Sequence, residues 1–215
     1  MNRQSVSKLF GKLQWKMVRI IGILGVLCLI VGQFQPDRVA AAPLAPADTW
    51  HALGSGVNDN VYAIAVAGQD VYLGGRFTDA GGASGPDNLV RWDAFYETWN
   101  AVGAGVDGTV WAIKVVGSDV YVGGEFTSAG SVASTSGIAR WDAVNSTWNS
   151  VCGGISEPEG YTVYAIDVVG TDVYVGGYMN AGGNYGVARC RASSWEGLWN
   201  DVNGDVLALA SAGSK

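Results

Sequence analysis

The stretch DVYLGG at residues 70–75 returns as DVYVGG at residues 119–124 and again at residues 172–177. A Gly and one other residue precede each copy, and an apolar run such as VYAIAV at residues 61–66 comes before them. A short Gly-containing segment between two apolar, β-branched runs is typical of a β-hairpin. The sequence therefore predicts one hairpin, built three times.

The hairpins belong to a longer repeat that is visible when the chain is aligned on tryptophan. Residues 50–98 and 99–147 are copies of equal length, and residues 148–198 are a third copy with an insertion, SEPEGY, at 156–161. Residues 199–215 begin a fourth copy and stop. Periods of about 20–50 residues are typical of stacked or radial repeat folds.

Each repeat is expected to form four strands, which in the first copy are residues 61–66, 70–77, 89–93 and 98–103. One such sheet cannot bury its own faces, so copies must pack against each other, and radial packing produces a β-propeller. The expected fold is all-β, a partial β-propeller of about three four-stranded blades. We expect the glycine pair to receive an aromatic ring from a neighbouring strand or blade, because glycine in a strand often marks close approach.

Residues 1–41 have the order of a bacterial secretory signal peptide: basic residues, a 15-residue apolar run and then small residues. An uncleaved anchor is the alternative, although the run is shorter than the roughly 20 residues that span a bilayer as a helix. Residues 42–49 are a Pro/Ala linker. The expected location is secreted or cell-surface, with no membrane span after cleavage.

The charge of the remaining chain argues against a polyanionic partner. Only Asp37 of the 19 acidic side chains precedes residue 42, whereas six of the 13 basic ones do, which leaves 18 acids, 7 bases and a net charge of −11. Nucleic acids and anionic membranes attract clustered Lys and Arg. We therefore expect no nucleic-acid partner.

The repeats resemble kelch repeats, the blades of kelch-type and galactose-oxidase-like propellers. The strand–turn–strand ending in a glycine pair (63–75) carries the resemblance, together with WDAFYETW at 92–99 and WDAVNSTW at 141–148. The third copy departs from this pattern at Cys190 and Arg191. The galactose-oxidase resemblance would imply a copper site with two histidines, but the chain has one, His51, so we expect no metal and no cofactor.

Residues that differ between equivalent positions are the candidates for ligand binding. Arg76, Glu125 and Tyr178 follow the three glycine pairs and differ in charge and shape. Propeller ligands commonly meet loops at one end or the central channel. Ordinary surface variation is the competing interpretation.

The two cysteines after residue 42 replace residues that are large or small in the other copies. Cys190 stands where the first two copies have Trp, and Cys152 stands where they have Gly54 and Gly103. If the Trp packs over the Gly within a blade, the exchange predicts a Cys152–Cys190 disulfide, with two buried free thiols as the alternative.

The ends of the repeat array do not complete a blade. WHALG at 50–54 is expected to be a lone fourth strand and residues 206–210 a lone first strand, which would leave uncovered edges. Either the chain is a fragment of a longer repeat protein, or two copies form a homodimer that completes a ring.

No nucleophile–base pair, metal-ligand cluster or phosphate loop is present in the sequence, so we expect no enzyme activity. The expected function is a secreted, non-enzymatic repeat module that binds an extracellular protein or glycan. The alternatives are the remnant of a larger secreted enzyme and a purely structural cell-surface array.

Overall fold

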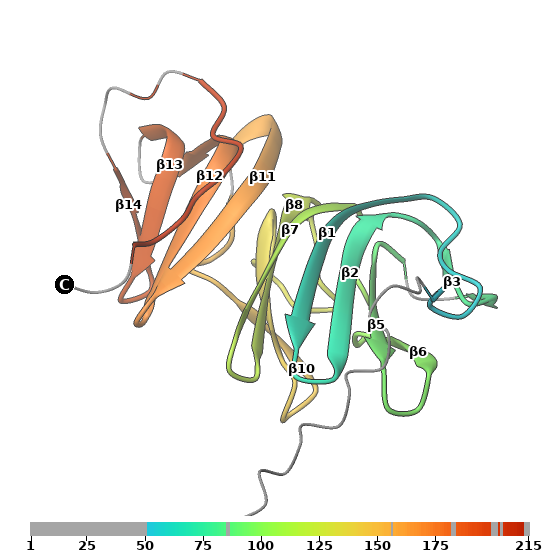
Figure 1. The fold of residues 1–215 in the computed structure, drawn as a ribbon. Coiled ribbons are helices and arrows are strands. Elements are labelled where there is room, and N and C mark those ends of the chain that lie inside the picture. The colour runs from blue at the N-terminus through green and yellow to red at the C-terminus, as the bar shows by residue number, and fades with distance from the viewer. Residues whose placement is uncertain are drawn as a thin grey trace, which may run out of the picture. The chain divides into compact units, whose positions relative to one another are not determined.

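The computed structural model describes residues 51–84, 87–155, 157–181, 184–198, 202 and 204–212. In these residues the chain forms three four-stranded antiparallel sheets and no helix (Figure 1). The prediction of an all-β fold with one four-stranded sheet per repeat is confirmed. The predicted signal peptide (1–41) and linker (42–49) lie outside the described residues.

The first sheet has the strand order β1-β2-β5-β6. Its strands are β1 (Asn60–Ala67), β2 (Asp70–Arg76), β5 (Leu89–Asp93) and β6 (Thr98–Ala101). Between β2 and β5 the chain forms a small extra hairpin that the sequence analysis missed, β3 (Asp79–Ala80) and β4 (Ala83–Ser84).

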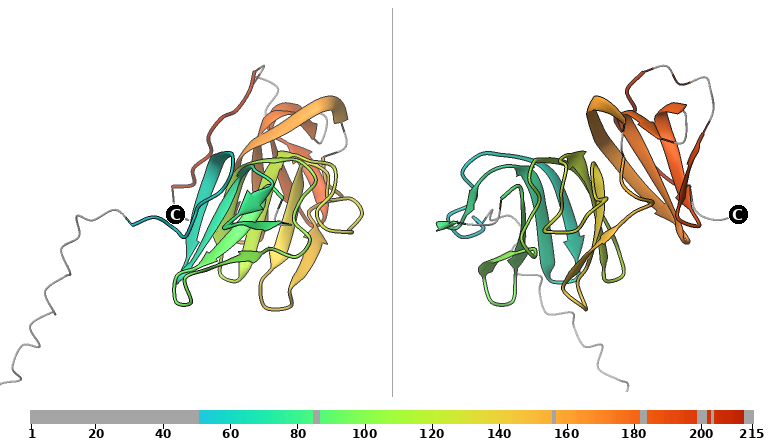
Figure 2. Two further views of the ribbon diagram at one scale, coloured as in Figure 1. Left: turned by 90° about the vertical axis from the view of Figure 1, so that its right-hand side faces the viewer. Right: turned by 180° about the vertical axis from the view of Figure 1, so that it is seen from behind.

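The second and third sheets repeat this order, and the sheets follow one another in chain order (Figure 2). The second contains β7 (Thr109–Val116), β8 (Asp119–Glu125), β9 (Ile138–Asp142) and β10 (Thr147–Ser150). The third contains β11 (Glu157–Val169), β12 (Asp172–Ala181), β13 (Asn184–Arg191) and β14 (Ser194–Gly197).

The glycine pair is required by two different close approaches. A Cβ on Gly74 would lie 2.3 Å from Val110 Cγ1 of the next sheet, and a Cβ on Gly75 would lie 2.0 Å from the Asn60 carbonyl oxygen of its own sheet. The pairing of β1 with β2 shifts register between Val61 and Ala63, which indicates a bulge there. The expected aromatic neighbour is therefore wrong: an aliphatic side chain and a backbone carbonyl occupy these places.

Two of the three buried clusters in the described residues lie between successive sheets, and the third, Leu73, Phe77, Ala80 and Val90, lies within the first repeat. One buried cluster joins Tyr72 and Leu89 of the first sheet to Val120 and Val122 of the second. Another joins the second sheet to the third, through Ile138 and Val163 among others. Among the described residues only the second sheet packs between two other sheets, and each repeat relies on its neighbours to bury apolar side chains.

A second contact recurs at the outer side of these interfaces. A Cβ on Gly103, which follows β6, would lie 2.7 Å from Trp141 Cζ3 in β9 of the next sheet. At the equivalent position one repeat later, Cys152 and Cys190 form a disulfide with their Cα atoms 5.9 Å apart. The expectation that Trp packs over Gly within a repeat holds, since Gly103 and Trp141 both belong to residues 99–147, and Gly54 lies beside Trp92 of its own repeat.

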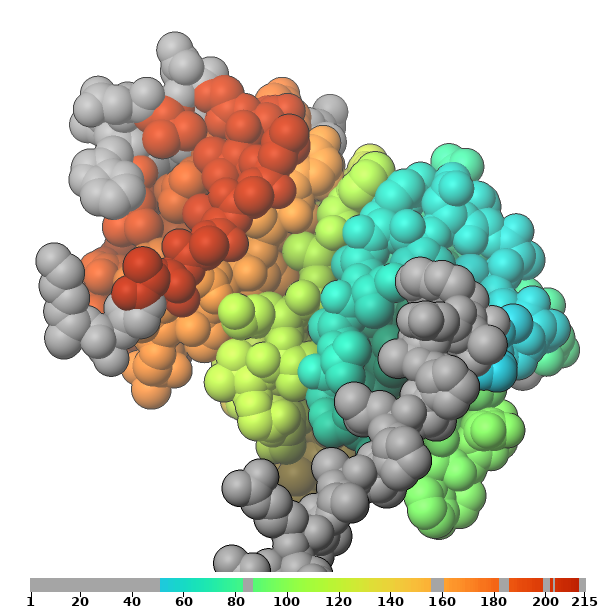
Figure 3. All heavy atoms as spheres, viewed as in Figure 1, coloured from blue at the N-terminus to red at the C-terminus, as the bar shows by residue number. Residues whose placement is uncertain are grey.

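The two expected end strands are not strands in the structure. Described residues 51–54 of the WHALG segment are irregular and turn, and residues 204–212 form no strand ladder. Residues 204–212 nevertheless lie over the third sheet (Figure 3), where Val206 and Leu209 approach Gly176.

Candidate ligand-binding surface

The structure places the three predicted ligand-binding residues at equivalent points of the three sheets. Arg76, Glu125 and Tyr178 follow the glycine pairs of β2, β8 and β12 and are exposed. In the strand pairing they lie opposite Asn60, Thr109 and Thr162 of the neighbouring first strands. These six positions define one end of the three hairpins, which we call the hairpin-end surface.

Only one of the two charged residues at this surface has an ionic partner. Arg76 Nε lies 3.5 Å from Asp59 Oδ2, and both side chains are exposed. The Glu125 carboxylate makes no hydrogen bond or ion pair within the described part of the chain. A carboxylate without internal partners keeps its full capacity to accept hydrogen bonds from a ligand.

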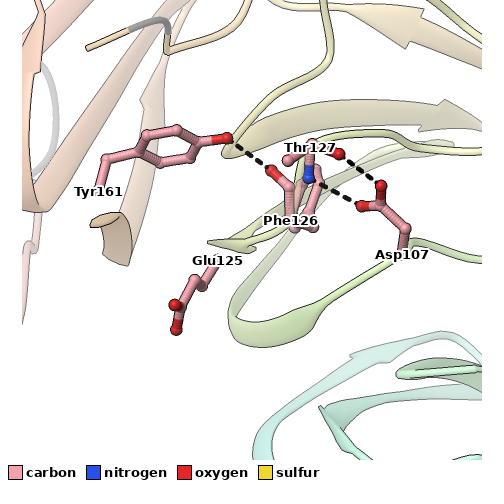
Figure 4. Close-up of a pocket in the computed structure, with 5 residues that line it drawn as sticks. All are labelled: Asp107, Glu125, Phe126, Thr127 and Tyr161. Atoms are coloured by element: carbon pink, nitrogen blue, oxygen red, sulfur yellow. Dashed lines mark hydrogen bonds between the residues drawn. The ribbon is translucent and has the colours of Figure 1, made fainter. Parts of the chain in front are cut away.

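Glu125 lies at the rim of a hollow with a volume of about 310 Å³. The other lining residues are Asp107, Phe126, Thr127 and Tyr161 (Figure 4). Tyr161 comes from the insertion of the third repeat, and its hydroxyl donates a 2.9 Å hydrogen bond to the Phe126 carbonyl. The insertion of the third repeat therefore contributes one of the residues that line the hollow.

The carboxylate of Asp107, which also lines the hollow, already accepts hydrogen bonds from the protein itself. Its carboxylate accepts hydrogen bonds from the Thr127 amide (2.8 Å), the Thr127 hydroxyl (2.5 Å) and the Ser128 amide (2.8 Å). Partial burial acts to raise the pKa of Asp107, but these hydrogen bonds outweigh it and hold the pKa below its ordinary value. In the first repeat Asn58 Oδ1 likewise accepts from the Thr78 and Asp79 amides, while Asn58 Nδ2 donates to the Thr78 hydroxyl, so this position orders a loop.

An aromatic row that was not predicted from the sequence crosses the first strands of the three sheets. The Tyr62 and Trp111 rings are stacked with centroids 4.2 Å apart, and the Trp111 and Tyr164 centroids are 5.7 Å apart. Asn60 Nδ2 lies 3.3 Å from the Tyr62 hydroxyl, which links the row to the hairpin-end surface. The signal was present in the sequence as VYAI, VWAI and VYAI at one position of each repeat.

An ion pair with a buried carboxylate lies further along the same strands. Lys114 Nζ of β7 is 2.7 Å from Asp167 Oδ1 of β11, and Asp167 is 4% exposed. Burial acts to raise the pKa of Asp167, but hydrogen bonds from Lys114 and Ser211 and the Lys114 charge lower it below the ordinary value. The pair joins the second sheet to the third, with the Asp167 carboxylate buried and the Lys114 side chain 39% exposed.

The described residues contain no group of three or more His, Cys, Asp or Glu side chains that could hold a metal ion. In the same residues, no helix has the length and apolar character needed to cross a membrane. His51 is exposed at the start of the described chain. The features that remain for chemistry are the exposed polar residues, the hollow and the aromatic row.

Comparison with known proteins supports the fold. No protein-family model matches the chain, and no curated protein matches it. Among solved structures, the computationally designed Ika4 protein is similar, with a TM-score of 0.50, 14% identity, and coverage of 77% of this chain and 89% of that one. At this identity the similarity shows the fold alone, a propeller-like repeat of four-stranded sheets.

Proposed function

We propose that this chain is a secreted, non-enzymatic repeat module with kelch-like blades, and that it binds an extracellular glycan or protein at the hairpin-end surface. The carrying observation is that Glu125 lies unpaired at a hollow that Tyr161 helps to line. A free carboxylate beside an aromatic side chain suits a ligand with hydroxyl or amide donors and an apolar face.

The differences between the three sheets support binding rather than a purely structural role. Residues that hold the sheets together repeat closely, as the Val110–Gly74 and Val163–Gly123 contacts illustrate. At the hairpin-end surface the equivalent positions hold a cation, an anion and a phenol. A surface with a purely structural role would not need side chains of such different charge and shape at equivalent positions.

Two further observations support the location and the kelch-like character. Disulfides persist in oxidising compartments, and Cys152–Cys190 accompanies a leader with the order of a secretory signal. The Trp residues of the kelch-like spacing pack as pairs, Trp92 with Trp99 at 4.9 Å and Trp141 with Trp148 at 5.3 Å between centroids.

A glycan array probed with the purified chain tests the proposal, followed by titration calorimetry of each glycan that binds. Glu125→Gln keeps the size of the side chain and removes its charge, so we expect the Kd to rise about tenfold or more. Glu97→Gln is the matched control, because Glu97 is an exposed carboxylate in the β5–β6 turn. An equal loss in both variants would contradict the assignment of the surface.

A protein ligand is tested by the same two variants in crosslinking to extracellular proteins of the source cells. Crosslinks that Glu125→Gln removes and Glu97→Gln retains support the protein arm of the proposal. If the chain binds neither glycan nor protein, the structural-array interpretation replaces it.

A further inference from the structure

The same packing contact joins the first sheet to the second and the second sheet to the third. Val110 and Ile113 of β7 pack against Gly74 of β2, with Val110 Cγ1 and Ile113 Cδ1 2.3 Å and 3.0 Å from the place of a Cβ on that glycine. Val163 and Ile166 of β11 pack against Gly123 of β8 in the same way, with Val163 Cγ1 and Ile166 Cδ1 2.7 Å and 2.9 Å from the place of a Cβ on Gly123. We call the two side chains the Val–Ile pair and the glycine its acceptor.

The first sheet carries a Val–Ile pair that no acceptor covers within the described residues. Val61 and Ile64 of β1 align with Val110 and Ile113, with the same bulge between them. Ile64 is 65% exposed and Val66, further along the strand, is 66% exposed, whereas the equivalent Ile166 is 8% exposed. This face is built for an interface that the first sheet does not make with the rest of the chain.

The third sheet carries the complementary acceptor, which the end of the chain occupies. A Cβ on Gly176 would lie 2.7 Å from Val206 Cγ1 and 3.3 Å from Leu209 Cγ. Val206 and Leu209 therefore stand in for a Val–Ile pair. Their segment forms no strand ladder, and Leu207 between them is 69% exposed, so the segment is held by these side-chain contacts together with the hydrogen bond between Ser211 and Asp167.

We propose that a second copy of this chain covers the β1 face, by placing its Gly176 acceptor over Val61 and Ile64 after its residues 204–212 have been displaced. The interface would reproduce the contacts that already join the three sheets. This Val–Ile pair, of which Ile64 is exposed and Val61 partly buried, lies on the first sheet and the acceptor on the third, so the contact is head-to-tail. A head-to-tail contact makes a ring when the rotation closes and a filament when it does not.

A dimer is compatible with the size of known propellers. Closed propellers typically have four to eight blades. The described residues of one copy form three four-stranded sheets, so the same residues of two copies supply six. In this arrangement residues 204–212 act as an internal competitor, because Val206 and Leu209 must leave Gly176 before Val61 and Ile64 of the partner can enter.

The competition is tested by light scattering on a sizing column, with the exported full chain over a range of concentrations. Leu209→Asp weakens the hold of the terminal segment on Gly176, so we expect the dimer dissociation constant to fall at least tenfold. Leu207→Asp is the matched control, because it adds the same charge to the same segment at a side chain that already faces solvent. We expect it to leave the dissociation constant unchanged.

Ile64→Asp tests the other side of the contact. Its side chain is exposed in the monomer, so the variant should keep its fold, while the dimer loses a buried apolar contact. We expect at least a tenfold rise in the dissociation constant, both alone and combined with Leu209→Asp. The measurement on Ile64→Asp alone can be interpreted even if the Leu209→Asp variant does not fold.

Two results would overturn the proposal. The first is a mass that stays monomeric at every concentration in the wild type and in Leu209→Asp, which would assign the β1 face to another occupant. The second is a dimer that Ile64→Asp leaves intact, since that dimer would use a different surface.

Discussion

Cys152, which follows β10, is bonded to Cys190 of β13, so a covalent link joins the second and third sheets where Trp141 packs against Gly103 one repeat earlier. The glycine position has a positive φ in all three repeats: 52° at Gly54, 58° at Gly103 and 48° at Cys152. The backbone is therefore the same, and the third repeat has replaced a packing contact with a bond.

Reduction of this disulfide should destabilise the protein without changing the arrangement of the sheets. The cysteines are 38 residues apart, and closing a loop of this size in the unfolded chain corresponds to about 4 kcal/mol in the chain-entropy model. The measurement is urea unfolding with and without reductant. In the Cys152→Ser, Cys190→Ser double variant, reductant should have no effect on the midpoint. Free thiols in the unreduced, denatured protein would rule out the bond.

Gly123→Ala should destabilise the protein, because the new methyl group would lie 2.7 Å from Val163 Cγ1 and 2.9 Å from Ile166 Cδ1. Overpacking of this kind costs about 1–3 kcal/mol. Gly204→Ala is the control, since no heavy atom lies within 4 Å of a Cβ there. Urea unfolding should show the loss for the first variant only. Equal stability of the two variants would mean that the interface between the second and third sheets is looser than the structure shows.

Asp107→Ala should weaken the loop that closes the hollow by about 1 kcal/mol, because the amides of Thr127 and Ser128 lose their acceptor. Asp107→Asn should retain most of the stability, since Asn58 makes the equivalent contacts in the first repeat. The folded-state pKa of Asp107 is lowered, so its contribution is complete above the unfolded value of about 3.9 and is lost as pH falls through the folded pKa.

The free energy of unfolding, measured as a function of pH in the acid range, distinguishes these variants from the wild type. Asp107→Asn has no carboxylate at this position to protonate, so its stability should fall less steeply below about pH 4 than that of the wild type. Parallel acid limbs in the two proteins would contradict the role assigned to the carboxylate.

Lys114→Met should raise the pKa of Asp167, because a carboxylate that is 4% exposed would lose its cation and remain desolvated. The carboxyl chemical shift of Asp167, followed by NMR during an acid titration, measures this directly. We expect a stability loss of about 2 kcal/mol near neutral pH. Because the wild-type pKa is lowered, the pair stabilises the fold above the unfolded pKa and the benefit disappears on acidification.

Replacing both charges provides the control for that prediction. Lys114→Met with Asp167→Asn removes the uncompensated buried charge, so it should be more stable than Lys114→Met alone. If the double variant is the less stable one, the two residues do not act as a pair.

Strand positions could be predicted closely because they follow from local patterns. The alternation in residues 89–93 and the Gly in each turn are properties of neighbouring residues, and β5 (Leu89–Asp93) has the bounds that the sequence predicted. The neighbour of Gly74 could not be predicted in the same way. Val110 lies 36 residues further along the chain, and a glycine has no side chain whose character would indicate what approaches it.

The candidate site, too, was partly predictable from local sequence and partly dependent on tertiary packing. The equivalence of Arg76, Glu125 and Tyr178 is a property of the repeat and was readable from the sequence. The hollow between Glu125 and Tyr161 depends on how an insertion in one repeat meets a loop of the previous one. The aromatic row was readable in principle, but its stacking depends on the spacing between sheets.

The sequence by itself determined that this chain is a repeat of four-stranded antiparallel sheets, because period, turn residues and strand alternation are local and recur. Only the tertiary structure decided which surfaces meet. It showed that the Val–Ile pair packs on the glycine of the previous sheet, that Val206 and Leu209 approach Gly176, and that Ile64 is left exposed. Those facts depend on packing between segments far apart in the chain, where complementary shape and burial select the partner.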